Sequence, residues 1–175
     1  MVKDLLKAFK NCDLVIEKEV ELQTVHQGYI EPHSGTAIWD EDDRVKVWTS
    51  TQGSFSNRDS VSKVLNLDVS RVKVTPMEIG GGFGGKIPVY LEPIAAVLSK
   101  KSRRPVQLVM SRTDVFDASG PAPGGKVIVK IGVNKEGKML AGYADIRLEA
   151  GGYPEAFIEA AAKCVFLATT FLLWI

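Results

Sequence analysis

The part of the sequence best suited to binding chemistry is a run of five glycines around a single phenylalanine. Residues 80–82 and 84–85 are the glycines, Phe83 lies between them, and Lys86 ends the run. Glycine adopts positive φ at little steric cost, and its missing Cβ lets a ligand approach the main chain closely. Successive backbone N–H groups in such a loop form a concavity that binds anions. The loop therefore predicts a ligand that carries phosphate or another anionic group.

Two known phosphate-binding patterns fit parts of this loop. Residues 80–86 satisfy the G-x-x-x-x-G-K part of a P-loop, but Ile87 stands where a magnesium-binding Ser or Thr is required. The same glycines contain G-x-G-x-x-G, the fingerprint of a dinucleotide-binding βαβ domain, in which Arg112 would bind the 2′-phosphate of NADP. The missing hydroxyl disfavours the P-loop, and the NADP-binding domain stays open as an alternative.

The hydrophobic pattern places the loop between a strand and a helix. A strand is expected at residues 71–79 and a helix at residues 89–101, with Pro88 and Pro93 tolerated at the first turn. A helix N-terminus directly behind the loop would favour a bound phosphate.

The remaining segments predict a mixture of strands and helices. Helices are expected at residues 3–12 and 55–66, and strands at residues 13–24, 35–39, 44–50, 105–110, 127–133 and 140–148. Val61, Val64 and Leu65 are the expected buried stripe of the second helix, and residues 40–43 are an expected hairpin turn. This pattern predicts an α+β fold with a mixed sheet, β-hairpins and two or three packed helices.

The composition excludes some classes of partner. The 175 residues include 22 basic and 21 acidic side chains, a net charge of +1, so neither nucleic acid nor an anionic membrane is an expected partner. The N-terminus lacks the apolar core of a signal peptide, and Cys12 and Cys164 are far apart in sequence. A reducing, cytoplasmic location is therefore expected.

The end of the chain has a different composition from the rest. Residues 165–175 read VFLATTFLLWI, carry no charge and are too few to span a bilayer. We expect one domain at residues 1–164, followed at 165–175 by an atypical apolar tail that is truncated or disturbed. Exposed apolar segments promote association, so the tail also predicts self-association.

Motifs outside the loop add a resemblance to a known family. Residues 29–33 read Y-I-E-P-H, residues 49–52 read T-S-T-Q, residues 104–106 read R-P-V and residues 111–114 read S-R-T-D. Together with G-G-G-F-G-G-K, they resemble motifs in the molybdenum-binding large subunit of the xanthine dehydrogenase, aldehyde oxidase and carbon monoxide dehydrogenase family. The resemblance covers nearly the whole chain to about Cys164, which implies an internal piece of that subunit and of its molybdenum-cofactor-binding domain.

The resemblance also implies roles for single residues. The implied cofactor contacts are Gly81, Gly82, Phe83, Gly84, Gly85 and Gln23; Gln27 lies near the same position, and Gln23 is the candidate kept. No side chain is expected to bind the metal, because the family holds molybdenum through the sulfurs of the pterin. Glu31 and His33 are expected to hold the turn under the loop. Gln52 is expected either to buttress the loop or to be a plain surface residue, and Lys86 either to attract an anion or to face solvent.

The implied activity belongs to a larger protein. The resemblance implies a molybdenum hydroxylase oxidoreductase that oxidises an aldehyde, a heterocycle or a similar small molecule with oxygen from water, while the molybdopterin cofactor carries the chemistry. Iron–sulfur clusters and flavin are expected on other domains or subunits, and the remainder of the large subunit is an expected partner. The family's general-base glutamate lies outside this chain, so we expect no catalytic residue here and no turnover by the chain alone. A non-catalytic interaction domain of the same fold is the alternative from another class.

Overall fold

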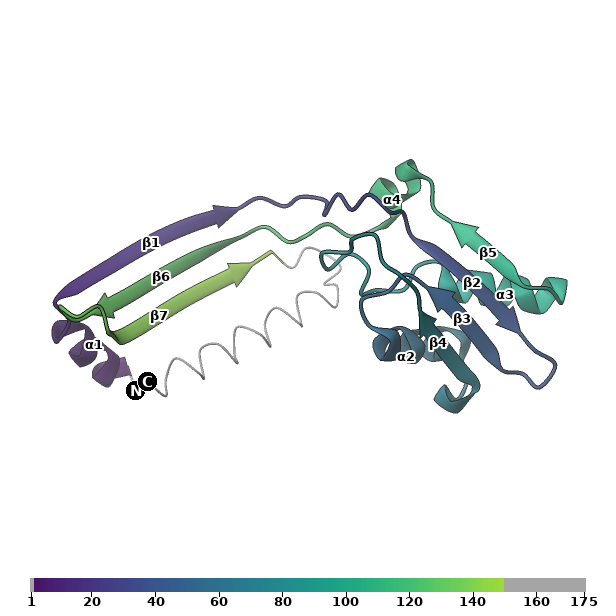
Figure 1. Ribbon diagram of the computed structural model, residues 1–175, viewed down its shortest axis with the longest axis horizontal. Helices are drawn as coiled ribbons and strands as arrows, with labels where there is room; N and C mark the ends of the chain where they lie inside the picture. The colour runs from purple at the N-terminus through teal and green to yellow at the C-terminus, as the bar shows by residue number, and fades with distance from the viewer. Residues whose placement is uncertain (1, 150–175) are drawn as a thin grey trace. The chain divides into compact units, whose positions relative to one another are not determined.

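A computed structural model describes residues 2–149, which form two compact units (Figure 1). Unit 1 contains residues 2–25 and 123–149, and unit 2 contains residues 26–122. This division was not evident from the sequence. The expected domain end at Cys164 and the apolar tail at residues 165–175 lie outside the described residues.

Unit 1 is a three-stranded antiparallel sheet with one helix. Strands β1 (Leu14–Leu22), β6 (Gly125–Val133) and β7 (Met139–Leu148) pair in the order β1-β6-β7 (Figure 1). Helix α1 (Val2–Lys10) precedes β1. The helix and the turn after it pack on one face of the sheet at Gly132, where a Cβ would lie 3.1 Å from the Phe9 ring.

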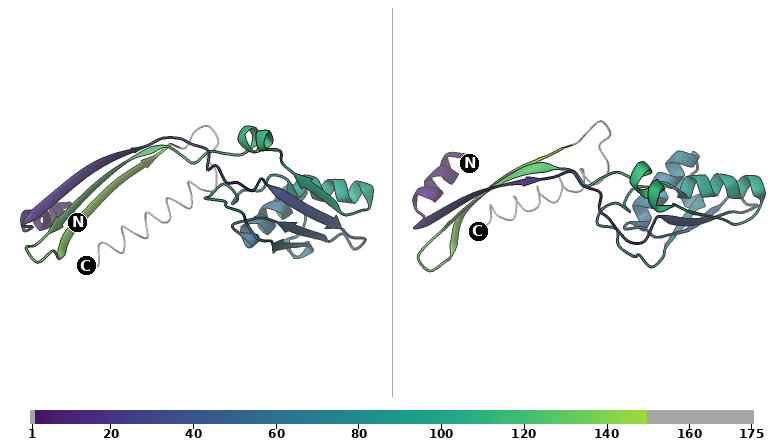
Figure 2. Two further views of the ribbon diagram at one scale, coloured as in Figure 1. Left: turned by 45° about the horizontal axis from the view of Figure 1, so that its top comes forward. Right: turned by 90° about the horizontal axis from the view of Figure 1, so that it is seen from above.

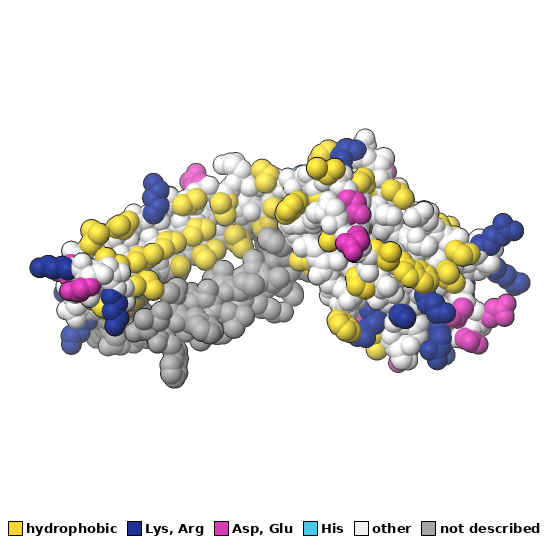
Figure 3. All heavy atoms as spheres, viewed as in Figure 1, with side chains coloured by type: hydrophobic (Ala, Val, Ile, Leu, Met, Phe, Trp, Pro, Cys, Tyr) yellow, Lys and Arg dark blue, Asp and Glu magenta, His cyan; other side chains and the backbone are white. Residues whose placement is uncertain are grey.

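The two faces of this sheet differ in chemistry. The face under α1 carries cross-strand ion pairs, including Lys130 Nζ to Glu17 Oε2 at 2.9 Å. On the opposite face, alternate β1 residues are apolar and about half exposed, namely Leu14, Ile16, Val20 and Leu22, with Lys18 as the one charged residue among them. Figure 3 shows hydrophobic side chains gathered along this sheet. The described residues of unit 1 therefore leave one sheet face mostly apolar and open.

Unit 2 is a mixed four-stranded sheet with helices packed on it. Its strands β2 (Ser34–Trp39), β3 (Val45–Thr49), β4 (Val72–Pro76) and β5 (Val106–Val109) pair in the order β4-β3-β2-β5. β2 and β3 form an antiparallel hairpin, whereas β3 and β4 are parallel. Helices α2 (Ser54–Leu65) and α3 (Glu92–Ser102) cover the sheet (Figure 2), and η1 (Val69–Arg71) and α4 (Arg112–Ala118) complete the unit.

The core of unit 2 lies between the sheet and α2 and α3. It consists of small and β-branched side chains, namely Ala37, Val45, Val47, Val61, Val72, Ala95 and Ala96. Side chains of this size allow the helices to approach the sheet closely and leave little unfilled space. The resulting base is rigid, and the loops at the ends of β3 and β4 extend from it.

The structure confirms the predicted α+β class and all seven strands, but it corrects some details. Val64 was expected in the buried stripe of α2 and is 64% exposed, whereas Val61 is fully buried in the core. The helix after the glycine run begins at Glu92 rather than at residue 89, which places Pro93 in its first turn as required. Helix α4 was not predicted. In the described part of the chain, no helix is both long and apolar enough to cross a bilayer.

Candidate functional site

The glycine loop at residues 80–86 lies beside the segment that follows β3. Because β3 and β4 are parallel, their carboxyl ends lie at the same edge of the sheet. Gln52, three residues after β3, accepts hydrogen bonds at its Oε1 from the N–H groups of Gly84 (2.9 Å) and Lys86 (3.1 Å). Its own N–H donates to the Lys86 carbonyl at 3.0 Å. The prediction that Gln52 buttresses the loop is therefore confirmed.

Glu31 holds the two ends of the loop together. Its Oε2 accepts from the Gly80 N–H at 2.7 Å and from Lys86 Nζ at 2.6 Å, and its backbone N–H donates to the Gly80 carbonyl at 3.2 Å. Burial raises the pKa of Glu31, but the hydrogen bonds from Lys86 and Gly80 outweigh this effect, and the pKa lies below its ordinary value of 4.5. Glu31 is therefore an ionised group that ties the loop ends together, which confirms its predicted structural role.

Lys86 does not face solvent. Its side chain is fully buried, and its Nζ lies 5.1 Å from the centroid of the Tyr29 ring. A buried ammonium is stable only when it is paired, and Glu31 supplies its charged partner. The anion that Lys86 was expected to attract is thus a side chain of the protein itself.

Three adjacent main-chain donors of the loop are unpaired. Among the described residues, the N–H groups of Gly81, Gly82 and Phe83 have no hydrogen-bond partner, whereas those of Gly80, Gly84, Gly85 and Lys86 do. Phe83 has a φ of +49°, which is uncommon for an aromatic residue, and its ring is 69% exposed. The loop therefore combines three adjacent free amides with one exposed aromatic ring.

The glycines are required mainly on the inner side of the loop. A Cβ at Gly82 would lie 2.5 Å from Gln52 Oε1, and a Cβ at Gly85 would lie 2.7 Å from the Tyr29 ring. Both distances are shorter than van der Waals contact, so each glycine lets a supporting side chain approach the main chain. The sequence argument, which assigned the missing side chains to ligand access alone, overlooked this role.

A buried hydrogen-bond network lies under the loop. The Tyr29 hydroxyl is 2.7 Å from His33 Nε2 and 3.2 Å from Ser119 Oγ, which is 3.0 Å from His26 Nε2. The Gly28 N–H donates to His26 Nδ1, which leaves Nε2 of that ring as the donor to Ser119. Burial is the main cause that lowers the pKa of His33 from 6.5 to about 4, and the positive charge of Lys86 is the second. Both effects favour the neutral form of His33.

Arg112 is engaged with the main chain under the loop. Its guanidinium donates to the carbonyls of Tyr29 (2.9 Å) and Ile30. The NADP hypothesis assigned Arg112 to a 2′-phosphate, whereas the structure bonds two of its donors to the main chain. In addition, β4 and β5, which flank the loop and α3, lie at opposite edges of the sheet rather than side by side as in a dinucleotide-binding unit.

The N-terminus of α3 is also occupied. The helix starts at Glu92, whose Oε1 accepts from Thr49 Oγ1 and Asn57 Nδ2 at 2.9 Å each. Its Oε2 accepts from the Tyr90 N–H at 3.0 Å. The prediction of a phosphate site at this helix end is therefore wrong, because the buried carboxylate of Glu92 already lies there.

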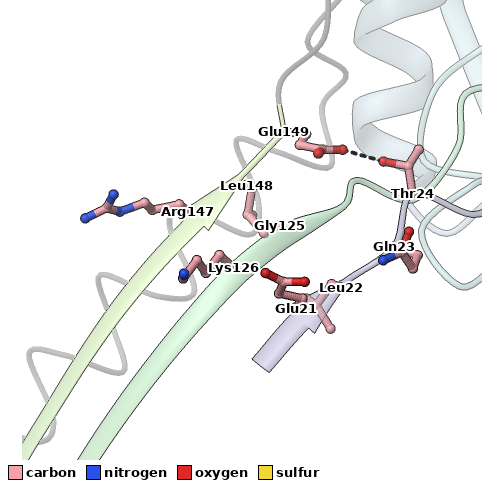
Figure 4. Close-up of a pocket in the computed structure, with 9 residues that line it drawn as sticks. All are labelled: Glu21, Leu22, Gln23, Thr24, Gly125, Lys126, Arg147, Leu148 and Glu149. Carbon is pink, nitrogen blue, oxygen red and sulfur yellow. Dashed lines mark hydrogen bonds between the residues drawn. The ribbon is translucent and has the colours of Figure 1, made fainter. Parts of the chain in front are cut away.

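Gln23, the predicted second contact, lies in unit 1 just after β1. It lines a surface pocket in which Thr24 Oγ1 donates to Glu149 Oε2 at 2.5 Å (Figure 4). Gln27, by contrast, lies in unit 2, and its Oε1 is 3.1 Å from the Cβ position of Gly85. That oxygen is buried and has no hydrogen-bond partner among the described residues. The sequence signal for Gln27 was its position two residues before Y-I-E-P-H.

No group of three or more His, Cys, Asp or Glu side chains in the described part of the chain is arranged to bind a metal ion.

Comparison with protein families identifies a match over nearly the full chain. The model of the molybdopterin cofactor-binding domain family matches residues 2–171. Nicotinate dehydrogenase large molybdopterin subunit of Eubacterium barkeri is 29% identical over 166 residues, which are 93% of this chain and 39% of that protein. Indole-3-acetaldehyde oxidase of Zea mays is 32% identical over 154 residues, which are 86% of this chain and 11% of that protein.

Solved structures have the same fold. Aldehyde oxidoreductase from Desulfovibrio gigas matches 81% of this chain with a TM-score of 0.65 and 21% identity. Carbon monoxide dehydrogenase from Oligotropha carboxidovorans matches 82% with a TM-score of 0.61 and 24% identity. The matched parts are 16% and 18% of those two chains. This chain therefore spans a minority of the length of each of these similar proteins.

Replacing Gly82 with alanine should disorder the loop. The new Cβ would displace Gln52 Oε1 and break its bonds to two loop amides, so we expect the free energy of unfolding to fall by about 2 kcal/mol. Gly35→Ala is the matched control, because the nearest atom to its added Cβ lies at an ordinary 3.5 Å. Denaturant unfolding of both variants measures the difference, and equal losses would contradict the packing described here.

The His33 pKa predicts a dependence of stability on pH. Between pH 6.5 and about 4, the unfolded chain binds a proton at this histidine that the folded chain does not. The free energy of unfolding should therefore fall as the pH is lowered through this window. Urea unfolding at several values from pH 7 to pH 5 should show this slope in the wild type and a smaller slope in His33→Gln. An unchanged slope in the variant would show that His33 is not the group responsible.

Proposed function

The chain belongs to the molybdopterin cofactor-binding domain family, and on this premise we propose that its glycine loop contacts the cofactor directly. The proposed donors are the N–H groups of Gly81, Gly82 and Phe83, which have no partner among the described residues. Gly84 and Gly85 complete the proposed contact loop, while their own N–H groups bond to Gln52 and to the Gly82 carbonyl. The observation that carries the proposal is this row of three adjacent free amides.

The chemistry of these groups fits molybdopterin. The cofactor has phosphate and metal-oxo oxygens that accept hydrogen bonds, and a concave row of main-chain N–H groups binds such oxygens well. The exposed Phe83 ring supplies an apolar surface beside them, which would exclude water from the bound cofactor. The Lys86 ammonium is not a proposed contact, because it is paired internally with Glu31.

We propose Gln27 as a second contact in the same unit. Its Oε1 is buried without a partner among the described residues, and an unpaired buried acceptor lowers stability. Pterin rings carry N–H donors that would satisfy this oxygen. Gln23, the contact favoured from the sequence, lies in the other unit. Its contact with the cofactor stays a prediction.

We propose that the whole protein is a molybdenum hydroxylase. The bound cofactor would supply two-electron oxidation of a small molecule, such as an aldehyde or heterocycle, with oxygen from water. The residues of this chain would bind and orient the cofactor and shield it from solvent. Its proposed partners are the remainder of the large subunit and iron–sulfur and flavin subunits or domains. Self-association of this chain, its lack of turnover in isolation and its cytoplasmic location stay predictions.

Direct binding of the pterin tests the proposal without any activity assay. Molybdopterin released from a purified molybdoenzyme is added to the chain under anaerobic conditions, and binding is followed by pterin fluorescence. Phe83→Ala should weaken binding at least about tenfold, because it removes the exposed ring beside the free amides. The matched control is Phe55→Ala, since Phe55 on α2 is exposed to a similar extent and is not in the loop. Absence of binding by the wild type, or equal effects of both variants, would contradict the proposal.

A further inference from the structure

One ion pair closes the glycine loop at its base. A single oxygen atom, Glu31 Oε2, accepts hydrogen bonds from the Gly80 N–H at the start of the loop and from Lys86 Nζ at its end. No other side chain in the described part of the chain bonds to both ends of the loop. The three free amides of Gly81, Gly82 and Phe83 lie between these two anchor points.

The burial of the pair is asymmetric. The Lys86 side chain is fully buried, whereas that of Glu31 is 34% exposed. Loss of the carboxylate would leave a buried ammonium with only the Tyr29 ring beside it. Loss of both charges together would leave no unpaired charge, and replacement of a buried ion pair by apolar groups is often neutral for stability. Stability and loop geometry can therefore be separated by experiment.

A loop of this composition does not keep its shape unaided. Glycine loses more conformational freedom on ordering than any other residue, and Phe83 must also be held at positive φ. If the loop were ordered only by the cofactor, binding would have to offset that loss, and affinity would fall. Bonds that order the loop beforehand remove this cost from the binding step.

We infer that Glu31 and Lys86 are positioning residues, whose ion pair holds the loop in its cofactor-binding shape before the cofactor arrives. This inference rests on the proposed role of the loop in molybdopterin binding. The pair acts through the main chain and does not touch the cofactor. Gln52 holds the second half of the loop through Gly84 and Lys86, and Glu31 holds the two ends of the loop together.

Two variants separate positioning from charge balance. Glu31→Gln keeps the side-chain shape and leaves the Lys86 ammonium without a carboxylate, so it should lower stability and speed hydrogen exchange at the Gly84, Gly85 and Lys86 amides at least about tenfold. The double variant Glu31→Gln with Lys86→Met removes the unpaired charge. We expect it to recover stability but to keep the fast exchange, because the tie between the loop ends is still missing. If the ion pair only balanced charge, the double variant would recover both the stability and the slow exchange.

An ion pair in unit 1 that also lies beside an aromatic ring provides the control. Lys130 Nζ is 2.9 Å from Glu17 Oε2 and 5.5 Å from the Phe9 ring centroid, but both of its side chains are partly exposed. Glu17→Gln, alone and with Lys130→Met, should change exchange in residues 84–86 less than twofold. Unchanged loop exchange in Glu31→Gln, or restored slow exchange in the Glu31/Lys86 double variant, would overturn the inference.

Pterin fluorescence then connects loop order to binding. Glu31→Gln and the double variant should both bind molybdopterin at least about tenfold more weakly than the wild type, and the Glu17 variants should bind normally. If Glu31→Gln and the double variant show the expected fast exchange but bind molybdopterin as tightly as the wild type, the inference that the ion pair positions the loop for the cofactor is overturned. If the wild type itself fails to bind, the proposed function fails, while the exchange measurements on the cofactor-free chain still show whether the pair holds the loop.

Discussion

The structure of unit 2 depends on how a loop with almost no side chains is kept in one conformation. Glycines cannot hold such a loop by packing, so its shape depends on hydrogen bonds to its main chain. Two side-chain oxygens accept three of these bonds: Gln52 Oε1 takes two loop amides, and Glu31 Oε2 takes one amide as well as the Lys86 ammonium. Gly85 bonds to the Gly82 carbonyl, and the amides of Gly81, Gly82 and Phe83 have no partner among the described residues.

Much of the surrounding structure serves to fix these two side chains. Gln52 follows β3, which Glu92 connects to α2 and α3 through Thr49 and Asn57. Glu31 lies in a segment whose carbonyls are bonded by Arg112. The Tyr29 ring below the loop is buried and hydrogen-bonded to His33. Glu92 and Tyr29 are buried and Arg112 is partly exposed, and each of these polar groups is itself paired. Such networks give a site one defined geometry.

The sequence was sufficient for the scaffold and for part of the site. Strand positions followed from alternating apolar residues, and the T-S-T-Q and Y-I-E-P-H motifs correctly predicted structural roles for Gln52 and Glu31. Other features depend on tertiary contacts that no local pattern reveals. Val64 satisfies helical periodicity as well as Val61 does, yet only Val61 meets the sheet. The partners of Lys86 and Arg112 lie 55 and more than 80 residues away in sequence. The free amides also required coordinates, because composition does not show which N–H groups are bonded.

The central claim is that the cofactor-free loop is already ordered, with three amides left free. Residue-resolved hydrogen exchange by NMR on the wild-type chain tests this claim most directly. The account predicts exchange near the intrinsic rate at Gly81, Gly82 and Phe83, and exchange at least about tenfold slower at Gly80, Gly84, Gly85 and Lys86. Uniformly fast exchange through residues 80–86 would contradict a preformed loop, and slow exchange at Gly81, Gly82 and Phe83 would contradict the presence of free donors.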